Sequence, residues 1–298
     1  MTSILIPGNT GQVGWELQSA LAPLGTVVAL DRNQMDVASP DSIRRVIREA
    51  RPEIIVNATG YTNVDKAESE PGLALQVNGI APGVMAEEAK RLGAILVHYS
   101  TDYVFDGELK RPYVEEDPAH PVNVYGRTKL AGERAIAAVG CAYFILRASW
   151  IYSARRSNFV LTILRLGREK AELSVVNDQI GSPASARSLA QATAALLRRR
   201  EHLEIGNHGV FHLSADGATS RYEFAKAIIQ GMAEVSGTID GWARVKPITS
   251  DQYPLPAIRP LHPVTNKGKV KRVFGIEMPH WKSQLQSFLS ELAARKSP

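Results

Sequence analysis

Five apolar runs alternate with helical patterns along the first half of this 298-residue chain, and that alternation limits its fold most strongly. Each run is continuously apolar, as expected for a strand that is covered on both faces of its sheet. The strand–helix–strand order predicts an α/β fold with a doubly wound parallel sheet and right-handed crossovers. The expected strands are Ser3–Pro7, Thr26–Asp31, Glu53–Thr59, Ala94–Thr101 and Ala142–Tyr152.

The pattern loosens after about residue 152, where glycines and prolines interrupt the helical segments. We therefore predict one domain over residues 1–152 and a smaller, irregular region over residues 153–298. The boundary is soft, and later strands and helices are free to rejoin the first sheet. The second region is expected at the carboxyl edge of the sheet, where ligands of such folds bind.

Composition places the chain among soluble globular proteins. Hydrophobic residues make up 44% and charged residues 22%, close to globular averages. The first residues carry no secretory pattern, and no apolar run reaches the roughly 20 residues that span a bilayer. With Cys141 as the only cysteine, no internal disulfide can form. These features predict a cytoplasmic protein without a membrane partner.

The net charge of +5 and the pI of about 9.3 are compatible with nucleic acid, but they suit a diphosphate-bearing small molecule equally. Basic residues gather at 198–200 and in 266–272. Neither cluster is interleaved with aromatic side chains, as a single-strand binding surface would be. We interpret both as solvated faces and expect no nucleic-acid partner.

Three glycines follow the first expected strand in the order Gly8-x-x-Gly11-x-x-Gly14. Such glycines permit a tight turn, close approach of the backbone to a pyrophosphate, and close packing of helix on strand. The free N–H groups at the helix start then face the phosphates. The loop predicts that residues 1–152 form a Rossmann-type NAD(P)-binding domain.

The end of the second expected strand supports the same interpretation. Asp31 stands where an acid accepts a hydrogen bond from the adenosine ribose, and Asp36 follows near the expected adenine edge. Arg32 comes directly after Asp31 and suits a 2′-phosphate. The choice between NADH and NADPH therefore stays open.

Tyr125 and Lys129 lie four residues apart and share one face if their segment is helical. Reduction of a ketone needs a proton donor at the carbonyl oxygen, and a neighbouring ammonium favours the phenolate of a tyrosine. Thr101, at the end of the fourth expected strand, is placed to hold that carbonyl. A second pair with this spacing, Tyr222 and Lys226, follows no expected cofactor-binding strand, so we assign it to an ordinary helix.

These residues resemble those of the extended short-chain dehydrogenase/reductases and, within that superfamily, the dTDP-4-dehydrorhamnose reductases. The matching stretches run in order along most of the chain: "GNTGQVGWEL", "RPEIIVNAT", "TNVDKAESEP", "VHYSTDYVFDG", "NVYGRTKLAGE", "RASWIYS", "LSVVNDQIGSP" and, more loosely, "AIRP". The resemblance implies reduction of the C4 ketone of dTDP-4-dehydro-6-deoxy-L-mannose by NADPH or NADH, the last step of dTDP-L-rhamnose synthesis.

The resemblance also implies site residues at the matching positions. Tyr125 would protonate O4, Lys129 would lower the tyrosine pKa and hold the nicotinamide ribose, and Thr101 would bind the carbonyl. The implied cofactor residues are Gly8, Thr10, Gly11, Gln12, Val13, Gly14, Asp31, Arg32, Asp36, Val37, Ala58, Thr59, Ser100, Tyr125 and Lys129. The implied substrate residues are Thr62, Val64, Thr101, Asp102, Tyr103, Tyr125, Trp150, Asn177, Gln179 and Arg259, whose guanidinium suits the diphosphate.

One departure concerns a metal. The resemblance implies that some relatives join two subunits through a divalent ion such as Mg²⁺, with one acid at the position of Glu16 and two more on a later helix. Here Arg187 and Gln191 stand at those two later positions. Metal bridging needs oxygen ligands, so we expect no metal site, although a homodimer stays an expectation.

Two other functions remain open on the same scaffold. A sugar-nucleotide 4-epimerase would use the same three residues but keep its cofactor through the cycle. A non-catalytic regulatory relative would generally lack the tyrosine or the lysine, and both are present here.

Overall fold

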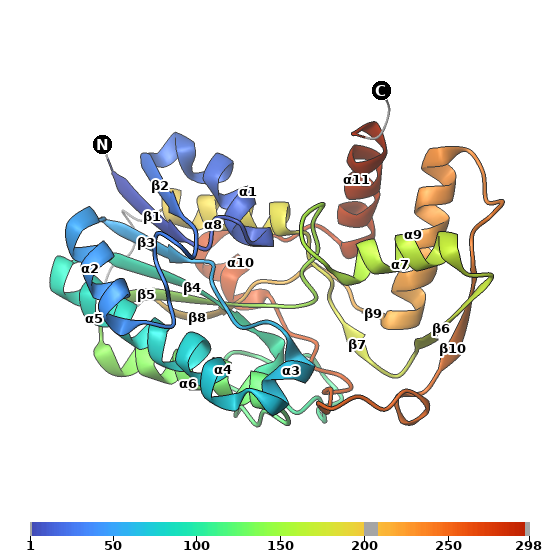
Figure 1. Cartoon of the computed structure of the whole chain (residues 1–298), viewed down its shortest axis with the longest axis horizontal. Coiled ribbons are helices and arrows are strands. Elements are labelled where there is room, and N and C mark those ends of the chain that lie inside the picture. Colours follow the sequence, from blue (N-terminus) through green and yellow to red (C-terminus); the bar gives the residue numbers. More distant parts are fainter. Residues whose placement is uncertain (1, 200–207, 296–298) are drawn as a thin grey trace.

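A six-stranded parallel sheet forms the centre of the computed structural model, which describes residues 2–199 and 208–295 (Figure 1). The strand order is β2-β1-β3-β4-β5-β8. The chain order therefore reverses between β1 and β3, which is where ligands bind in open sheets of this kind. The strands are β1 (Ser3–Pro7), β2 (Thr26–Leu30), β3 (Ile54–Asn57), β4 (Ile95–Thr101), β5 (Ala142–Ala148) and β8 (Gly209–His212).

Helices cover both faces of this sheet, as the alternation predicts (Figure 1). One face is covered by α1 (Gln12–Leu21), α8 (Ala186–Arg198) and α10 (Gly268–Phe274). The other face is covered by α2 (Pro40–Ala50), α5 (Ala81–Leu92) and α6 (Val124–Val139). Each face buries its own apolar cluster, with Ile4 and Ile6 of β1 in one and Leu5 in the other. The Rossmann-type prediction is confirmed.

The helical stretch over residues 71–92 is interrupted. It consists of α4 (Pro71–Leu75), a π-helical turn (Gln76–Ile80) and α5, and α3 (Val64–Ser69) precedes it. The first helix, α1, ends at Leu21 and continues as a short 3₁₀ turn (Ala22–Leu24). The fifth strand ends at Ala148, short of the expected Tyr152, because Trp150 has a φ of +42° and leaves the extended conformation.

A smaller lobe follows the sheet, on the right of Figure 1. It contains α7 (Phe159–Glu169), α9 (Arg221–Ser236) and two short sheets, β10 (Arg244–Ile248) with β6 (Glu172–Val176), and β7 (Ile180–Gly181) with β9 (Thr219–Ser220). The last helix is α11 (Trp281–Ala294). Because β8 joins the main sheet and α8 packs on α1, residues after 152 contribute to both parts. The two-domain division at residue 152 stays a prediction.

No helix among the described residues is long and apolar enough to cross a bilayer. Arg200, in the first basic cluster, lies outside the described residues. Cys141 is buried as a free thiol.

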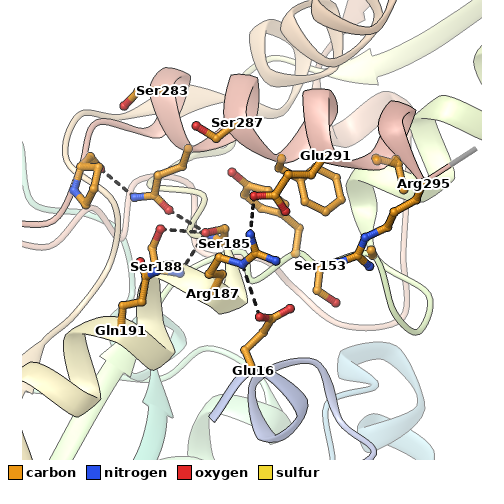
Figure 2. Close-up of a pocket in the computed structure, with 16 residues that line it drawn as sticks. Glu16, Ser153, Ser185, Arg187, Ser188, Gln191, Ser283, Ser287, Glu291 and Arg295 are labelled. Atoms are coloured by element: carbon orange, nitrogen blue, oxygen red, sulfur yellow. Dashed lines mark hydrogen bonds and ion pairs between the residues drawn. The ribbon is translucent and has the colours of Figure 1, made fainter. Parts of the chain in front are cut away.

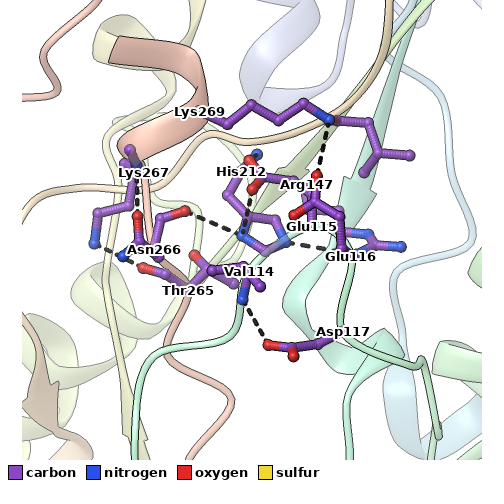
Figure 3. Close-up of polar contacts among 12 residues, drawn as sticks. Val114, Glu115, Glu116, Asp117, Arg147, His212, Thr265, Asn266, Lys267 and Lys269 are labelled. Atoms are coloured by element: carbon purple, nitrogen blue, oxygen red, sulfur yellow. Dashed lines mark hydrogen bonds and ion pairs between the residues drawn. The ribbon is translucent and has the colours of Figure 1, made fainter. Parts of the chain in front are cut away.

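The segment between β4 and α6 is fixed to the end of β8 by buried polar contacts (Figure 3). The backbone N–H of His212 donates to Glu115 at 2.8 Å, and the His212 ring contacts the Asn266 carbonyl through Nδ1 at 3.1 Å. Asn266 in turn donates its backbone N–H to Tyr113 at 2.7 Å. Burial, aided by the nearby Arg147 guanidinium, lowers the His212 pKa to about 3. His212 is therefore neutral in the folded protein at neutral pH.

We predict that His212 makes the fold sensitive to acid. Below the unfolded pKa of 6.5, the unfolded chain binds a proton that the folded chain takes up only near pH 3. This site therefore lowers the free energy of unfolding by about 1.4 kcal/mol per pH unit across that window. Urea unfolding at pH 7.5 and pH 5.0 should show a smaller loss for His212→Asn than for the wild type. The same substitution at exposed His120 is the control, and equal losses in all three proteins would contradict the prediction.

Candidate active site

The glycine loop turns sharply between β1 and α1. Gly8 has a φ of +92°, and its carbonyl accepts from the N–H of Gly11 at 2.9 Å. A Cβ on Gly14 would lie 2.1 Å from the Gly8 carbonyl oxygen, so α1 approaches the loop as closely as a backbone can. Gly8 also packs on Ala58 and Thr59, where a Cβ would meet backbone and side-chain atoms at 2.9–3.0 Å. The loop thus forms a cradle at the switch point of the sheet.

The helix start fits a dinucleotide phosphate. Gly11 is the N-cap of α1 and provides no side-chain cap, and the first turn carries no acid. The first N–H groups of α1 are therefore left for an anion. The Val13 side chain is buried in the core, which leaves its backbone to face a ligand.

A segment after β5 holds the loop from the other side. Arg156 donates to the carbonyl and the hydroxyl of Thr10, both at 3.0 Å. Ser153 and Asn158 both donate to the Gln12 side-chain oxygen at 3.1 Å. These contacts cannot be predicted from the sequence, because they join residues 141–146 positions apart.

The residues after β2 are occupied by their own turn. Asp31 Oδ1 accepts from the backbone N–H groups of Asn33 and Gln34 at 2.8 and 3.1 Å. Arg32 is exposed and lies 3.9 Å from Asp36 in a loose ion pair, and half-buried Val37 follows. This arrangement keeps the Arg32 guanidinium at the surface beside the loop.

The end of β4 brings together the residues expected to act on a carbonyl. The Thr101 hydroxyl contacts the Tyr125 hydroxyl and favours its phenolate, whereas burial raises the Tyr125 pKa and is the larger effect. Tyr103 packs edge-on against Tyr125 with ring centroids 5.9 Å apart. Asp102 accepts from Ser149 at 2.6 Å and from Thr101 at 3.1 Å, and burial raises its pKa to about 6. Because burial raises its pKa, Tyr125 is a protonated phenol at neutral pH.

Lys129 lies one turn beyond Tyr125 on α6 and is buried. Its Nζ donates to the Tyr99 carbonyl at 2.5 Å and contacts His98 Nε2 at 3.1 Å. Burial lowers the Lys129 pKa to about 8. The expected lowering of the Tyr125 pKa by Lys129 stays a prediction.

Ser100 forms a hydrogen bond that stabilises the fold around the site. Its hydroxyl donates to Glu133 at 2.5 Å, and Glu133 also accepts two bonds from Arg147, at 2.9 and 2.6 Å. This buried ion pair fixes α6 to β5.

The other expected substrate residues lie on several elements of the fold. Val64 begins α3, with exposed Thr62 just before it, and the Trp150 ring packs over Gly181. Asn177 accepts from Ser220 at 2.6 Å, and Gln179 donates to Ser250 at 3.0 Å, so both lie where the smaller lobe meets its loops.

Arg259 differs from expectation in its partner. Its guanidinium donates two hydrogen bonds to Asp65 at 2.7 Å and also contacts Tyr103. The guanidinium that the resemblance assigns to the substrate diphosphate is therefore bound to an internal carboxylate. Its hydrogen bonds hold the Asp65 pKa below its usual range.

The pocket in Figure 2 lies apart from this chemistry. Its lining includes Glu16, Arg187 and Gln191 but none of Thr101, Tyr125 and Lys129. Arg187 lies 3.5 Å from Glu16 and forms a close ion pair with Glu291 of α11. At the position where the resemblance places a metal ligand, a guanidinium therefore joins three helices.

Comparison with known protein families matches residues 1–294 to the RmlD substrate binding domain. The chain belongs to this family. It is 44% identical to a dTDP-4-dehydrorhamnose reductase from Burkholderia thailandensis, over 94% of this chain and 95% of the relative. It is 41% identical to one from Escherichia coli K12, over 97% of this chain and 98% of the relative.

Solved structures agree with this membership. A dTDP-4-dehydrorhamnose reductase from Clostridium acetobutylicum has a TM-score of 0.90 at 34% identity, covering 98% of this chain and 100% of that one. The enzyme from Bacillus anthracis, solved in complex with NADP, has a TM-score of 0.87 at 34% identity and the same coverage. A UDP-glucose 4-epimerase from Thermus thermophilus shares the fold, with a TM-score of 0.81 at 17% identity over both whole chains.

One further candidate residue of this site is not among those predicted from the sequence. Arg221, the first residue of α9, stacks on Trp150 with its guanidinium carbon 3.7 Å from the ring centroid. Its guanidinium also contacts Tyr103. Among the described residues no ion pair holds this guanidinium, although the nearby Asp102 carboxyl attracts it. A cation at a helix N-terminus is unfavourable beside the positive end of the helix dipole. An arginine at this position is therefore the feature of the sequence that could indicate a role other than helix formation.

We predict that Gly14→Ala weakens NADPH binding at least about tenfold, because the new Cβ must displace the Gly8 backbone from the phosphate loop. Gly72→Ala is the matched control, since a Cβ there meets nothing within 4 Å. Cofactor fluorescence titration gives the dissociation constants, and circular dichroism checks the fold. Wild-type affinity in folded Gly14→Ala would contradict this role of the loop.

Proposed function

We propose that this protein is a dTDP-4-dehydrorhamnose reductase, which reduces the C4 ketone of dTDP-4-dehydro-6-deoxy-L-mannose to dTDP-L-rhamnose with NADPH or NADH. The observation that carries the proposal is the contact of Tyr125 with Thr101, with Lys129 one turn away at the edge of the sheet where the glycine cradle lies. Two relatives that are 41–44% identical to this chain over nearly its whole length carry that name, and this supports the proposal. The protein is an NAD(P)-dependent oxidoreductase of this family.

The residues fit the cofactor. The Gly8–Gly14 cradle and the open start of α1 would hold its pyrophosphate, Asp31 and Arg32 would face the adenosine ribose, and Lys129 would face the nicotinamide ribose. When bound, the reduced nicotinamide supplies a hydride. The protein must then orient the ketone, supply a proton and exclude water.

Thr101 and Tyr125 provide the first two of these functions. Their hydroxyls are in contact with each other, and the carbonyl oxygen O4 would lie beside both. Since burial keeps Tyr125 a phenol, it is ready to donate its proton to O4. The Tyr103 ring, which packs edge-on against Tyr125, would shield this position from water on one side.

Two guanidiniums converge beside the same position, since Arg221 and Arg259 both contact Tyr103. The charge of Arg259 is balanced by Asp65. We assign the substrate diphosphate to Arg221, with Arg259 beside it. The sugar nucleotide is thus the proposed partner, whereas a cytoplasmic location and a homodimer stay predictions.

Substitution of the tyrosine tests the function. Tyr125→Phe should lower kcat by at least about 100-fold, because O4 loses its proton donor, while NADPH affinity is retained. Tyr222→Phe, in the second pair, should keep wild-type turnover. Turnover is followed at the nicotinamide absorbance with the dTDP-4-keto-sugar, and the product is identified. Near wild-type kcat in Tyr125→Phe would exclude it as the donor.

Substitution of Arg221 tests the substrate assignment. Arg221→Gln should raise KM for the sugar nucleotide at least about tenfold with a smaller change in kcat, because a charge-assisted bond to the diphosphate is lost. Lys226→Gln, on the same helix and paired with Glu223, is the control. An unchanged KM in Arg221→Gln would remove this residue from the diphosphate site.

The cofactor content of the purified protein separates the reductase from an epimerase. A reductase releases its nicotinamide in each turnover and is purified largely without it, whereas an epimerase retains one equivalent through dialysis. A stoichiometric nicotinamide absorbance, together with no net oxidation of NADPH, would favour the epimerase.

A further inference from the structure

Residues 153–158 form a strap between β5 and α7 that lies against the glycine loop. At the start of the strap, Ser153 donates to the Gln12 side chain at 3.1 Å. At its end, Asn158 donates to the same oxygen of Gln12 and caps α7 by accepting from the Leu161 N–H. The strap is therefore anchored at both ends to the first turn of α1.

Arg156, in the middle of the strap, has a backbone conformation that arginine rarely adopts. Its φ of +59° lies in the left-handed region, which disfavours every side chain larger than that of glycine. Strained residues of this kind persist where surrounding contacts hold them, and they are concentrated at active sites and ligand clamps. Glycine would make the same turn without strain, so the guanidinium is the feature that needs an explanation.

The Arg156 guanidinium lies against Thr10, between Gly8 and Gly11 of the glycine loop. Nε donates to the Thr10 carbonyl and Nη2 to the hydroxyl oxygen, both at 3.0 Å. A guanidinium has five N–H donors, so three remain after these two contacts. Arg156 is exposed and forms no ion pair within the described part of the chain. Its charge is therefore available to an anion at the loop.

The same contact orients the Thr10 hydroxyl. Because Nη2 donates to Oγ1, the hydroxyl acts there as an acceptor, and its own proton stays free for another partner. Thr10 is exposed, so a ligand can reach this proton. The Gln12 side chain is held by the strap and that of Val13 is buried, which leaves their backbone N–H groups for a ligand. The loop thus gathers several donors of different kinds.

The charges nearby favour an anion at this place. The first turn of α1 contains no acid, and Glu16 on the next turn lies 3.5 Å from Arg187 in an ion pair. Arg155, the neighbour of Arg156 in the strap, is placed differently. Its guanidinium stacks on the Trp15 ring, with Cζ 3.2 Å from the ring centroid.

We propose that Arg156 is a cofactor-binding residue, whose guanidinium binds the cofactor pyrophosphate together with the Thr10 hydroxyl that it orients. The inference rests on the NAD(P) cofactor of the proposed function and not on the identity of the sugar. The planar guanidinium matches two phosphate oxygens at once, which a lysine ammonium does not. Because NADH and NADPH share the pyrophosphate, Arg156 strengthens the binding of both.

Calorimetric titration of the free protein with NADPH and with NADH tests the assignment. Arg156→Gln should raise both dissociation constants by the same factor, at least about fivefold, because charge-assisted hydrogen bonds are lost. Arg155→Gln is the matched control, since it removes the same charge one residue away and should have a much smaller effect. Equal losses in the two variants would reduce the effect to overall charge and overturn the proposal. A loss confined to NADPH would place Arg156 at the 2′-phosphate and overturn the pyrophosphate assignment.

Arg156→Gly separates cofactor binding from stability. Glycine adopts a φ of +59° freely, so relief of strain should offset the two lost hydrogen bonds and leave the melting temperature little changed. Cofactor affinity should nevertheless fall as in Arg156→Gln. Arg156→Lys keeps the charge without the planar guanidinium and should restore only part of the affinity. Wild-type affinity in Arg156→Gly would show that the arginine serves the strap alone.

Thr10→Val tests the part of the hydroxyl. It should also weaken both cofactors, and its loss should be less than additive with that of Arg156→Gln, since both variants remove parts of one phosphate contact. Additive losses would overturn the joint role of the two residues. Absence of cofactor binding in the wild type would remove the proposed function and this inference together. Weaker binding in Arg156→Gln, with no reduction of the keto-sugar by the wild type, would support the inference and count against the proposed function alone.

Discussion

Parallel pairing of β1, β3 and β4 is the constraint on which the site depends, because it places the carboxyl ends of three strands at one edge of the sheet. The glycine loop and the Ala58–Thr59 turn follow β1 and β3 directly, and Thr101 is the last residue of β4. None of these segments is near another in sequence. Their close approach is permitted by Gly8 and Gly14, whose missing side chains let backbone lie on backbone. The glycine loop and Thr101 thus come to lie at the same edge of the sheet without any long connecting loop.

The sequence predicts the sheet because its signals are local. An unbroken apolar run reports burial on both faces, and β1 begins and ends as predicted. The ends of other strands depend on single residues in the folded structure. Trp150 leaves the extended conformation and so ends the fifth strand early, which no periodicity can report. The return of β8 to the main sheet depends on tertiary pairing in the same way.

The residues of the candidate site also differ in whether the sequence alone can predict them. Tyr125 and Lys129 can be found from their spacing, since one helix face brings them together. The Arg259–Asp65 pair joins residues 194 positions apart, and the His98–Asn57 contact depends on strand register. The sequence does not single out Arg221, because the pattern around it resembles that of an ordinary helix. Polar partners chosen by tertiary structure therefore mark the limit of inference from one sequence.

The Glu133–Arg147 ion pair has a consequence for how the enzyme responds to heat. Glu133 lies one helical turn after Lys129, and its carboxylate ties that part of α6 to the core of β5. The lysine is therefore preorganised, and little conformational entropy is lost at α6 when a ligand binds. Because one buried ion pair serves both the fold and the geometry of the site, α6 cannot loosen without misplacing Lys129. Loss of activity on heating should then coincide with cooperative unfolding, with no preceding phase in which a folded enzyme is inactive.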